Sequence, residues 1–390
     1  MKKTLLLALW ILGAPVFVIS AYAQLPLTAA DASKISPILD NRPSNTLDCW
    51  VVPTKPTLDF VFRFVAGYTV HCPLAQFDGR KTSVVIYLRV TPEKSAAMIL
   101  GLAHDIPDVP REIQNPAANN FGSKDRDVVL SGAFGLGQGK YSVELLLRDD
   151  RNRTYRKRWK LHARIGGSDR GVAMAIKPGT VESVDDPKWQ TVSSERGGKL
   201  RLTILLDAAP LDPDQTTLHA WDRALLLEMI YTVLRRIPHQ SARLVAFSLD
   251  QQKELFRSDP FDDGAFKALS DTLQGAEFSS ISVEALKKKT STEFLGGLTN
   301  HEFAAQKSDA IIFLGPNTEM DLHIPAGTVP GGASPGPRVF YVEYFWWVGE
   351  QFPDEISRLV RAAGGKVFPV HTPAQLDESI DKMLRTLKQE

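Results

Sequence analysis

The stretch LRLTILLDAAPLD, residues 200–212, carries the strongest fold signal in the chain. Its first part is an almost continuous apolar run, which predicts a buried strand of the kind found in parallel sheets. The run ends at one carboxylate, Asp207, followed by Ala208, Ala209 and Pro210. Open α/β sheets bind ligands beyond the carboxyl ends of their strands, so the stretch raises the question whether Asp207 belongs to a metal site.

Strands and helices alternate over the rest of the second half. Residues 218–237 predict an amphipathic helix whose apolar residues recur at every fourth position, beginning with Trp221. A closing helix is expected after the last of four further strands. These strands are expected at residues 243–249, 309–314, 338–344 and 366–370. The alternation predicts an α/β class with a mainly parallel sheet.

One segment of this half cannot form a parallel crossover. The sequence AFSLDQQKELF, residues 246–256, contains two strand-like runs separated by only Asp250, Gln251 and Gln252. A parallel connection needs about a dozen residues, usually a helix, so the two runs must form a hairpin. The sequence therefore predicts one antiparallel strand at an edge of the sheet.

Taken together, these features resemble a von Willebrand factor A domain. The likeness covers residues 199–390 and depends on the order of the strand that ends in Asp207, the long helix and the hairpin. It also includes DAIIFLGP at 309–316 and GGKVFPV at 364–370. The resemblance implies an α/β, doubly wound, mainly parallel and Rossmann-like sheet with one antiparallel edge strand.

In that family a divalent cation, usually Mg²⁺, is held by a D-x-S-x-S run, a loop threonine and a later aspartate, because Mg²⁺ prefers oxygen ligands. Asp207 matches the first aspartate of the run. Ala209 and Leu211 replace the two hydroxyl residues, and Gly315 and Pro316 occupy the place of the later aspartate. The resemblance therefore implies a degenerate cation site, without metal and without any cofactor.

Two residues stay as residual metal candidates, Asp207 and Thr292, with Thr290 as the alternative loop threonine. A cation site that recruits other ligands, such as Asp212 or Asp214, is a third possibility for this half.

The first half has a different periodicity. Apolar residues alternate with other residues at 58–64, 84–90 and 141–147, and no helical stretch separates them. Residues 140–148 and 155–163 flank a turn-rich DDRNR and predict a hairpin. Several short strands in succession predict an all-β, immunoglobulin-like sandwich.

The domain boundaries follow from these changes of pattern. Residues 24–45 lack periodicity and are interpreted as a tether, followed by the sandwich at 46–165. Residues 166–198 begin and end with Gly-Gly and are interpreted as a linker before the second domain at 199–390.

The first 23 residues predict a secretory signal peptide. Lys2 and Lys3 precede an apolar run at 5–19 and the small-residue sequence Ala-Tyr-Ala, so cleavage is expected near Ala23. An uncleaved N-terminal anchor is the alternative, although the run is short for a membrane span. We expect a secreted or periplasmic protein with no membrane span after signal removal.

Only two cysteines are present, Cys49 and Cys72. An oxidising compartment favours a disulfide between them, and two buried free thiols are the alternative. The chain carries 46 Lys and Arg against 45 Asp and Glu, a balance that argues against nucleic acid as a partner.

The sequence contains no complete enzyme motif. HEFAA at 301–305 lacks the second histidine of a zinc protease motif, and its His301 and Glu302 are expected on a solvated helix face. No nucleophile elbow or dinucleotide motif is present either. An enzyme, hydrolase-like, with an unrecognised site near Asp207 and His371 is the alternative hypothesis.

A binding surface is the main hypothesis. A long Gly- and Pro-rich loop at 315–337 and an aromatic run at 344–347 follow strands that end at the same edge as Asp207. The predicted binding residues are Asp207, Tyr344, Phe345, Trp346 and Trp347. The sequence thus predicts a non-enzymatic interaction or adhesion module whose partner is a protein or glycan of the cell envelope, although the aromatic run could instead pack as core.

Overall fold

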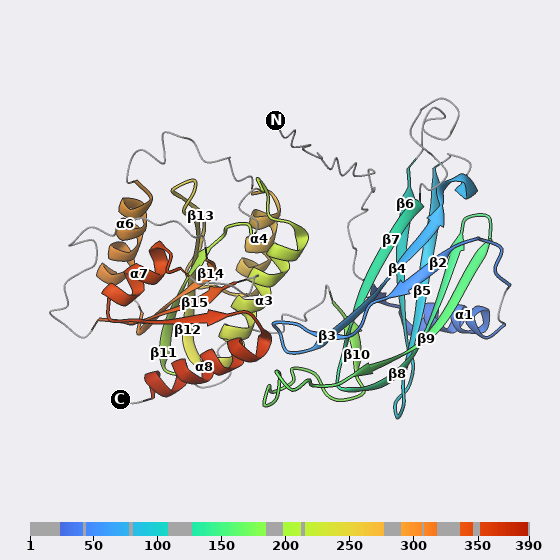
Figure 1. The fold of residues 1–390 in the computed structure, drawn as a ribbon, viewed down its shortest axis with the longest axis horizontal. Coiled ribbons are helices and arrows are strands. Elements are labelled where there is room, and N and C mark those ends of the chain that lie inside the picture. Colours follow the sequence, from blue (N-terminus) through green and yellow to red (C-terminus); the bar gives the residue numbers. More distant parts are fainter. Residues whose placement is uncertain are drawn as a thin grey trace, which may run out of the picture. The chain divides into compact units, whose positions relative to one another are not determined.

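A computed structural model of the chain describes residues 24–41, 44–77, 81–107, 127–184, 198–211, 215–276, 290–305, 308–317, 336–345 and 352–388. The chain divides into two compact units, which Figure 1 draws as ribbons. The first unit comprises residues 1–57, 65–163 and 178–185, and the second comprises residues 58–64, 164–177 and 186–390. Among the described residues, no helix is long and apolar enough to cross a membrane.

The first unit is built on two antiparallel sheets. One has the strand order β1-β6-β5-β8-β9, and the other has the order β10-β7-β4-β2, with β3 also paired to β4. The strands are β1 (Leu25–Pro26), β2 (Trp50–Pro53), β3 (Thr57–Leu58), β4 (Phe64–Pro73), β5 (Thr82–Pro92), β6 (Met98–Ile106), β7 (Asp127–Leu136), β8 (Gly139–Asp149), β9 (Thr154–Ala163) and β10 (Val181–Ser183). A short 3₁₀ helix, η1 (Leu74–Phe77), follows β4.

Alternating burial explains these strands. In β5 the side chains of Val84, Ile86, Leu88 and Val90 are fully buried, because strand side chains point alternately to the two faces of a sheet. The β8–β9 hairpin predicted from the sequence is present. The carboxylate of Asp149 closes its turn by accepting the backbone N–H groups of Arg151 and Arg153.

Residues 24–45 are not a plain tether. They contain β1 and a helix, α1 (Ala29–Asp40), whose start is capped by Thr28: its Oγ1 accepts the N–H of Asp31 at 3.2 Å. Pro37 lies inside the helix and Leu39 is fully buried. The Thr-x-x-Asp sequence at the start of this helix is a local signal for a helix N-terminus. The segment lacks the long apolar periodicity that predicts an amphipathic helix.

The segment 58–64 is also not the strand that its alternating pattern predicts. Asp59 accepts the N–H groups of Val61 and Arg63 and pairs with the Arg63 guanidinium at 2.7 Å, which folds the segment into a turn. Phe60 and Phe62 pack in the core of the second unit, where the Phe60 carbonyl accepts the Thr232 hydroxyl at 2.6 Å. The first half of the sequence therefore completes the core of the second unit.

The predicted linker is likewise divided between the units. Strand β10 pairs with β7 in the first unit, whereas the N–H of Ala175 donates to the Phe62 carbonyl in the second. Residues 185–197 lie outside the described residues.

The second unit contains a mixed six-stranded sheet with the order β13-β12-β11-β14-β15-β16. Its strands are β11 (Leu200–Asp207), β12 (His239–Ser248), β13 (Lys253–Ser258), β14 (Ala310–Pro316), β15 (Arg338–Tyr344) and β16 (Lys366–Val370). The β12–β13 pair is the antiparallel hairpin, and the other neighbouring pairs run parallel.

Helices cover both faces of this sheet (Figure 1). On one face α3 (Ala220–Arg236), α4 (Asp263–Gln274) and α8 (Pro373–Leu387) share a core with Leu202, Ile204 and Leu206 of β11. On the other face α6 (Thr290–Ala304) and α7 (Glu355–Ala362) pack on Leu205 of β11. Trp221, expected on the apolar stripe of α3, is instead 59% exposed, because it lies in the first turn of the helix, at its exposed end.

The expected fold class is wrong as a description of this chain. Among the described residues strand outweighs helix, 41% to 29%, and the three sheets are antiparallel or mixed. The expected immunoglobulin-like sandwich followed by a doubly wound, mainly parallel domain is therefore not what the chain forms. The segments after residue 199 do not form the second unit by themselves, because residues 58–64 and 164–177 belong to it as well.

The two cysteines form a disulfide. Cys49 immediately precedes β2, Cys72 lies in β4, and their Cα atoms are 4.3 Å apart. The pairing of Trp50 with His71 in the adjacent register position brings the two cysteines opposite each other.

Candidate functional site

Acidic side chains gather beyond the carboxyl ends of the strands in the second unit. Asp207 ends β11, Asp250 follows β12, Glu343 lies near the end of β15, and Asp354 and Glu355 begin α7. We name these five residues the carboxyl-edge cluster. Their charges interact: those of Asp250, Asp354 and Glu355 all act on Asp207, and that of Asp354 acts on Glu343. Topology thus brings together carboxylates from four elements that are distant in sequence.

Asp207 is the least compensated member of the cluster. Its side chain is fully buried, and within the described part of the chain no side chain hydrogen-bonds to either carboxylate oxygen. Burial raises the pKa of Asp207 well above its ordinary value, and the charges of Asp250 and Asp354 raise it further. The backbone of Leu249 offsets only part of this rise. The surroundings of Asp207 therefore favour the neutral, protonated form of its carboxyl group.

Glu343 accepts more hydrogen bonds than Asp207, but its pKa is also raised. Its Oε1 accepts the Asn317 amide at 2.7 Å and the Ser357 hydroxyl at 2.9 Å. Burial, together with the charge of Asp354, nevertheless raises the pKa of Glu343 to about 7. Hydrogen bonds lower the cost of burying this carboxylate without supplying a positive charge.

Asp354 and Glu355 are fixed by the start of α7. Asp354 caps the helix by accepting the N–H of Ser357 at 2.7 Å, and its other oxygen accepts the Tyr341 hydroxyl at 3.0 Å. Glu355 Oε1 accepts the Ser291 hydroxyl at 3.1 Å, and burial raises the pKa of Glu355. No common sequence spacing marks these acids, because Asp207 and Glu343 lie within strands, Asp250 follows β12, and Asp354 and Glu355 begin a helix.

Two residues of the predicted aromatic surface, Tyr344 and Phe345, are buried. Tyr344 and Phe345 are only 5% and 2% exposed. Tyr344 packs edge-on against Phe60 at 5.5 Å, and Phe345 stacks on His371 at 5.3 Å. Both are core side chains, which agrees with the alternative that the aromatic run packs as core. Trp346 and Trp347 lie outside the described residues.

The sheet order also separates the two residues of the enzyme hypothesis. Asp207 ends β11 and His371 follows β16, and two strands lie between them. Neighbouring strands are about 4.8 Å apart, which places the two backbones on the order of 14 Å from each other. This distance excludes a direct hydrogen bond between Asp207 and His371.

The residues around Asp207 do not fit the Mg²⁺ site implied by the resemblance. Ala209 is buried, and like Leu211 it offers no side-chain oxygen. Thr292 is buried in the first turn of α6. Across the described ranges no three His, Cys, Asp or Glu side chains are grouped to hold a metal ion. The side chain of Thr290, and Asp212 and Asp214, are not among the described residues.

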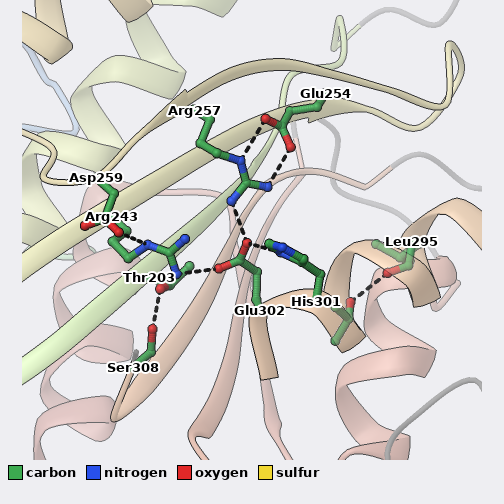
Figure 2. A network of polar contacts seen from close by, with 10 residues as sticks. Thr203, Arg243, Glu254, Arg257, Asp259, Leu295, His301, Glu302 and Ser308 are labelled. Atoms are coloured by element: carbon green, nitrogen blue, oxygen red, sulfur yellow. Dashed lines mark hydrogen bonds and ion pairs between the residues drawn. The ribbon is translucent and has the colours of Figure 1, made fainter. Parts of the chain in front are cut away.

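Glu302, expected on a solvated helix face, is buried in an ion-pair network (Figure 2). Its Oε2 accepts Arg243 and its Oε1 accepts Arg257, both at 2.7 Å. Arg243 also pairs with Asp259 at 2.9 Å, and Arg257 with Glu254 at 2.6 Å. Only His301 next to it is mainly exposed, as predicted. The network joins α6 to β12 and β13.

No family model and no curated protein matches the chain. A Bordetella pertussis protein provisionally named ApaA is 10% identical over 32% of this chain and 100% of its own, with a TM-score of 0.19. Bacteroides uniformis beta-glucuronidase 2 is 9% identical over 82% of this chain and 39% of its own, with a TM-score of 0.19. A glycosyl hydrolase family 2 member from Bacteroides cellulosilyticus is 10% identical over 82% and 43%, with a TM-score of 0.20.

These likenesses are too weak to carry an argument about fold or function. They do not indicate a von Willebrand factor A domain, and the resemblance noted from the sequence stays an untested prediction.

Proposed function

We propose that the chain is a secreted or periplasmic, non-enzymatic interaction protein that binds a protein or glycan of the cell envelope through the carboxyl edge of the six-stranded sheet, without a metal. One observation carries the proposal. Trp221 and Phe352, the two most exposed aromatic side chains described in the second unit, are each 59% exposed, and both lie at this edge. Exposed aromatic residues on a rigid scaffold are typical anchors of binding surfaces.

Their position follows from the sheet. Because β11 and β15 run parallel within it, the helices that follow them begin at the same carboxyl edge. Trp221 lies in the first turn of α3, and Phe352 immediately precedes the capped start of α7. The Asn317 amide donates to the Phe352 carbonyl at 2.9 Å, which fixes this backbone against the end of β14. The aromatic groups are therefore presented by ordered backbone, which lowers the entropy cost of binding.

The localisation part of the proposal rests on two features. A disulfide between Cys49 and Cys72 fits an oxidising compartment. The predicted signal peptide at residues 1–23 lies outside the described residues and remains the sequence argument for export.

The test is capture of partners from an envelope extract on the immobilised chain. We expect Trp221→Ala combined with Phe352→Ala to remove the captured material, and a chelator to leave it unchanged. Trp50→Ala is the matched control, because Trp50 is a 46% exposed tryptophan of the first unit. Capture that survives the double substitution, or that is lost with chelator, would contradict the proposed surface.

The alternative hypothesis, an extracytoplasmic hydrolase, keeps one supporting observation. Carboxylates with raised pKa values concentrate at catalytic sites, and the carboxyl-edge cluster contains several. A broad hydrolase screen with Glu343→Gln as control distinguishes the two functions, since an activity abolished by that substitution would favour catalysis.

A further inference from the structure

The first unit contains a cavity of about 300 Å³, which is at the lower end of the range for small-molecule sites. It lies on the sheet with the strand order β1-β6-β5-β8-β9, whose strands β5, β8 and β9 are labelled in Figure 1. The lining residues are Arg89, Thr91, Ala97, Ser142, Glu144 and Arg158.

The strand register arranges most of these side chains in two rows. Arg89, Glu144 and Arg158 are opposite one another on β5, β8 and β9. Two positions along, Thr91 and Ser142 are opposite one another, and Lys160 of β9 is opposite Ser142. Partners in register point to the same side of a sheet, so Lys160 joins the lining side chains on one face. The residues between the rows, such as Val90 and Val143, are fully buried on the other face.

Glu144 organises the charges of the first row. Its Oε2 accepts Arg89 through Nε at 3.1 Å and Nη2 at 2.6 Å. Its Oε1 accepts Arg158 through Nε at 2.9 Å and Nη2 at 2.7 Å, and also pairs with Arg156. The carboxylate is thus occupied on both oxygens, and the guanidinium groups are held in fixed orientations. Such charge-assisted pairs fix geometry as well as adding energy.

The cluster keeps a surplus of positive charge. Within the described residues, the single carboxylate of Glu144 is shared by the guanidinium groups of Arg89, Arg156 and Arg158, and Asp40 bonds Arg89 at 2.6 Å. Arg158 donates to Glu144 through Nε and Nη2, which lie on one edge of its guanidinium group, and 44% of its side chain is exposed. A ligand can therefore reach this guanidinium without a large desolvation cost. Lys160 adds a further positive charge on the same face.

We propose that this cavity binds a small hydroxylated organic anion, with its carboxylate or phosphate on Arg158 and Lys160 and its hydroxyl groups near Thr91 and Ser142. The role of Glu144 is to position the arginines rather than to contact the anion. Carboxylate- and phosphate-bearing ligands share the oxyanion that this charge surplus recognises, and Arg presents donors that suit both.

The proposal is tested by calorimetric titration of the full chain at low salt with galacturonate, galactose and inorganic phosphate. We expect galacturonate or phosphate to bind saturably and galactose not to bind. Arg158→Gln should weaken anion binding by about tenfold or more, and Lys160→Gln by less, as expected for losing one charge-assisted contact. If inorganic phosphate binds and galacturonate does not, the ligand of this site carries a phosphate group rather than a carboxylate.

Arg148→Gln is the matched control, since Arg148 of the same sheet bonds Asn152 at the hairpin turn and does not line the cavity. It should leave binding unchanged, and circular dichroism should show all variants folded. If Arg158→Gln fails to fold, the exposed Lys160→Gln carries the test. Equal binding of galactose and galacturonate, full binding by both variants, or no saturable signal from either anion up to about 10 mM would overturn the proposal.

Discussion

Two ends of one face of the six-stranded sheet bury carboxylates in opposite ways. Near Thr203 of β11, the fully buried Glu302 is held by Arg243 and Arg257. At the other end of the same strand, the fully buried Asp207 has neither a cation nor a side-chain hydrogen-bond partner among the described residues. The two positions on β11 are four residues apart, or about 13 Å.

The difference shows what a counter-charge does to a buried acid. Burial alone would raise the pKa of Glu302, but bonds from Arg257 and His301 and the charge of Arg243 hold it below its ordinary value. For Asp207, burial acts with neighbouring acids and the pKa rises. One end of this face is therefore cross-linked by ion pairs, whereas burial and neighbouring acids favour the neutral form of Asp207 at the other end.

We expect the largest loss of stability when the charge of Glu302, the buried carboxylate held by two arginines, is removed. Glu302→Gln should lower the free energy of unfolding by about 3–5 kcal/mol, because it leaves the buried Arg243 with only Asp259 as partner. Urea denaturation measures this change. Glu254→Gln removes the exposed partner of the same Arg257 and should cost less than about 1 kcal/mol. Equal effects of the two substitutions would show that burial does not distinguish the pairs.

We expect a smaller loss of stability when a side chain is added next to Asp207, the buried carboxylate without an arginine partner among the described residues. A Cβ added at Gly315 would lie 2.8 Å from the Asp207 Cβ and 3.0 Å from its carbonyl oxygen. Gly315→Ala should therefore cost about 1–3 kcal/mol in a thermal or urea unfolding measurement. Gly297→Ala on α6, where nothing lies within 4 Å, should be neutral or slightly stabilising. An unaffected Gly315→Ala variant would mean that the edge near Asp207 has room to relax.

The pH dependence of stability should come from the uncompensated acids. The pKa of Glu343 rises from its ordinary 4.5 to about 7, so between these values the folded chain binds more protons than the unfolded chain. Stability is then highest at the acidic end and falls as pH rises through about 7. Glu343→Gln should flatten this fall by about 1–2 kcal/mol between pH 5 and 8, measured by urea denaturation. If the substitution leaves the slope of the unfolding free energy against pH unchanged, Glu343 does not contribute to the pH dependence of stability.

Glu228 provides a second contribution of the same sign. Burial and the charge of Asp59 raise the pKa of Glu228 to about 8, although Arg63 opposes this. For this reason the test for Glu343 is the difference between wild type and variant rather than the wild-type profile.

The smallest effect is expected at Asp207 itself. A protonated aspartic acid and an asparagine are both neutral and similar in size, so Asp207→Asn should change stability at pH 7 by less than about 1 kcal/mol. This contrasts with Glu302→Gln in the same assay. A loss as large as that of Glu302→Gln would show that Asp207 is ionised and has a positive partner.

Some of these features could be predicted from local patterns. The strand that ends at Asp207 and the hairpin at 246–256 are present where the sequence places them. Apolar periodicity and connection length act between near neighbours, so they can be read from one segment at a time. The turn at Asp59 was missed because its side chain, rather than the apolar alternation of 58–64, determines that backbone.

The sequence by itself determined the strand that ends at Asp207, the hairpin at 246–256 and the β8–β9 hairpin, and that only two cysteines were available to pair. Tertiary structure alone decided which carboxylates are compensated. Glu302 meets Arg243 from 59 residues away and Arg257 from 45, whereas the charged groups that act on Asp207 are other acids, Asp250, Asp354 and Glu355. The physical reason is that the free energy of a buried charge depends on what lies a few ångströms away in space, and chain folding, rather than any local pattern, sets that neighbourhood.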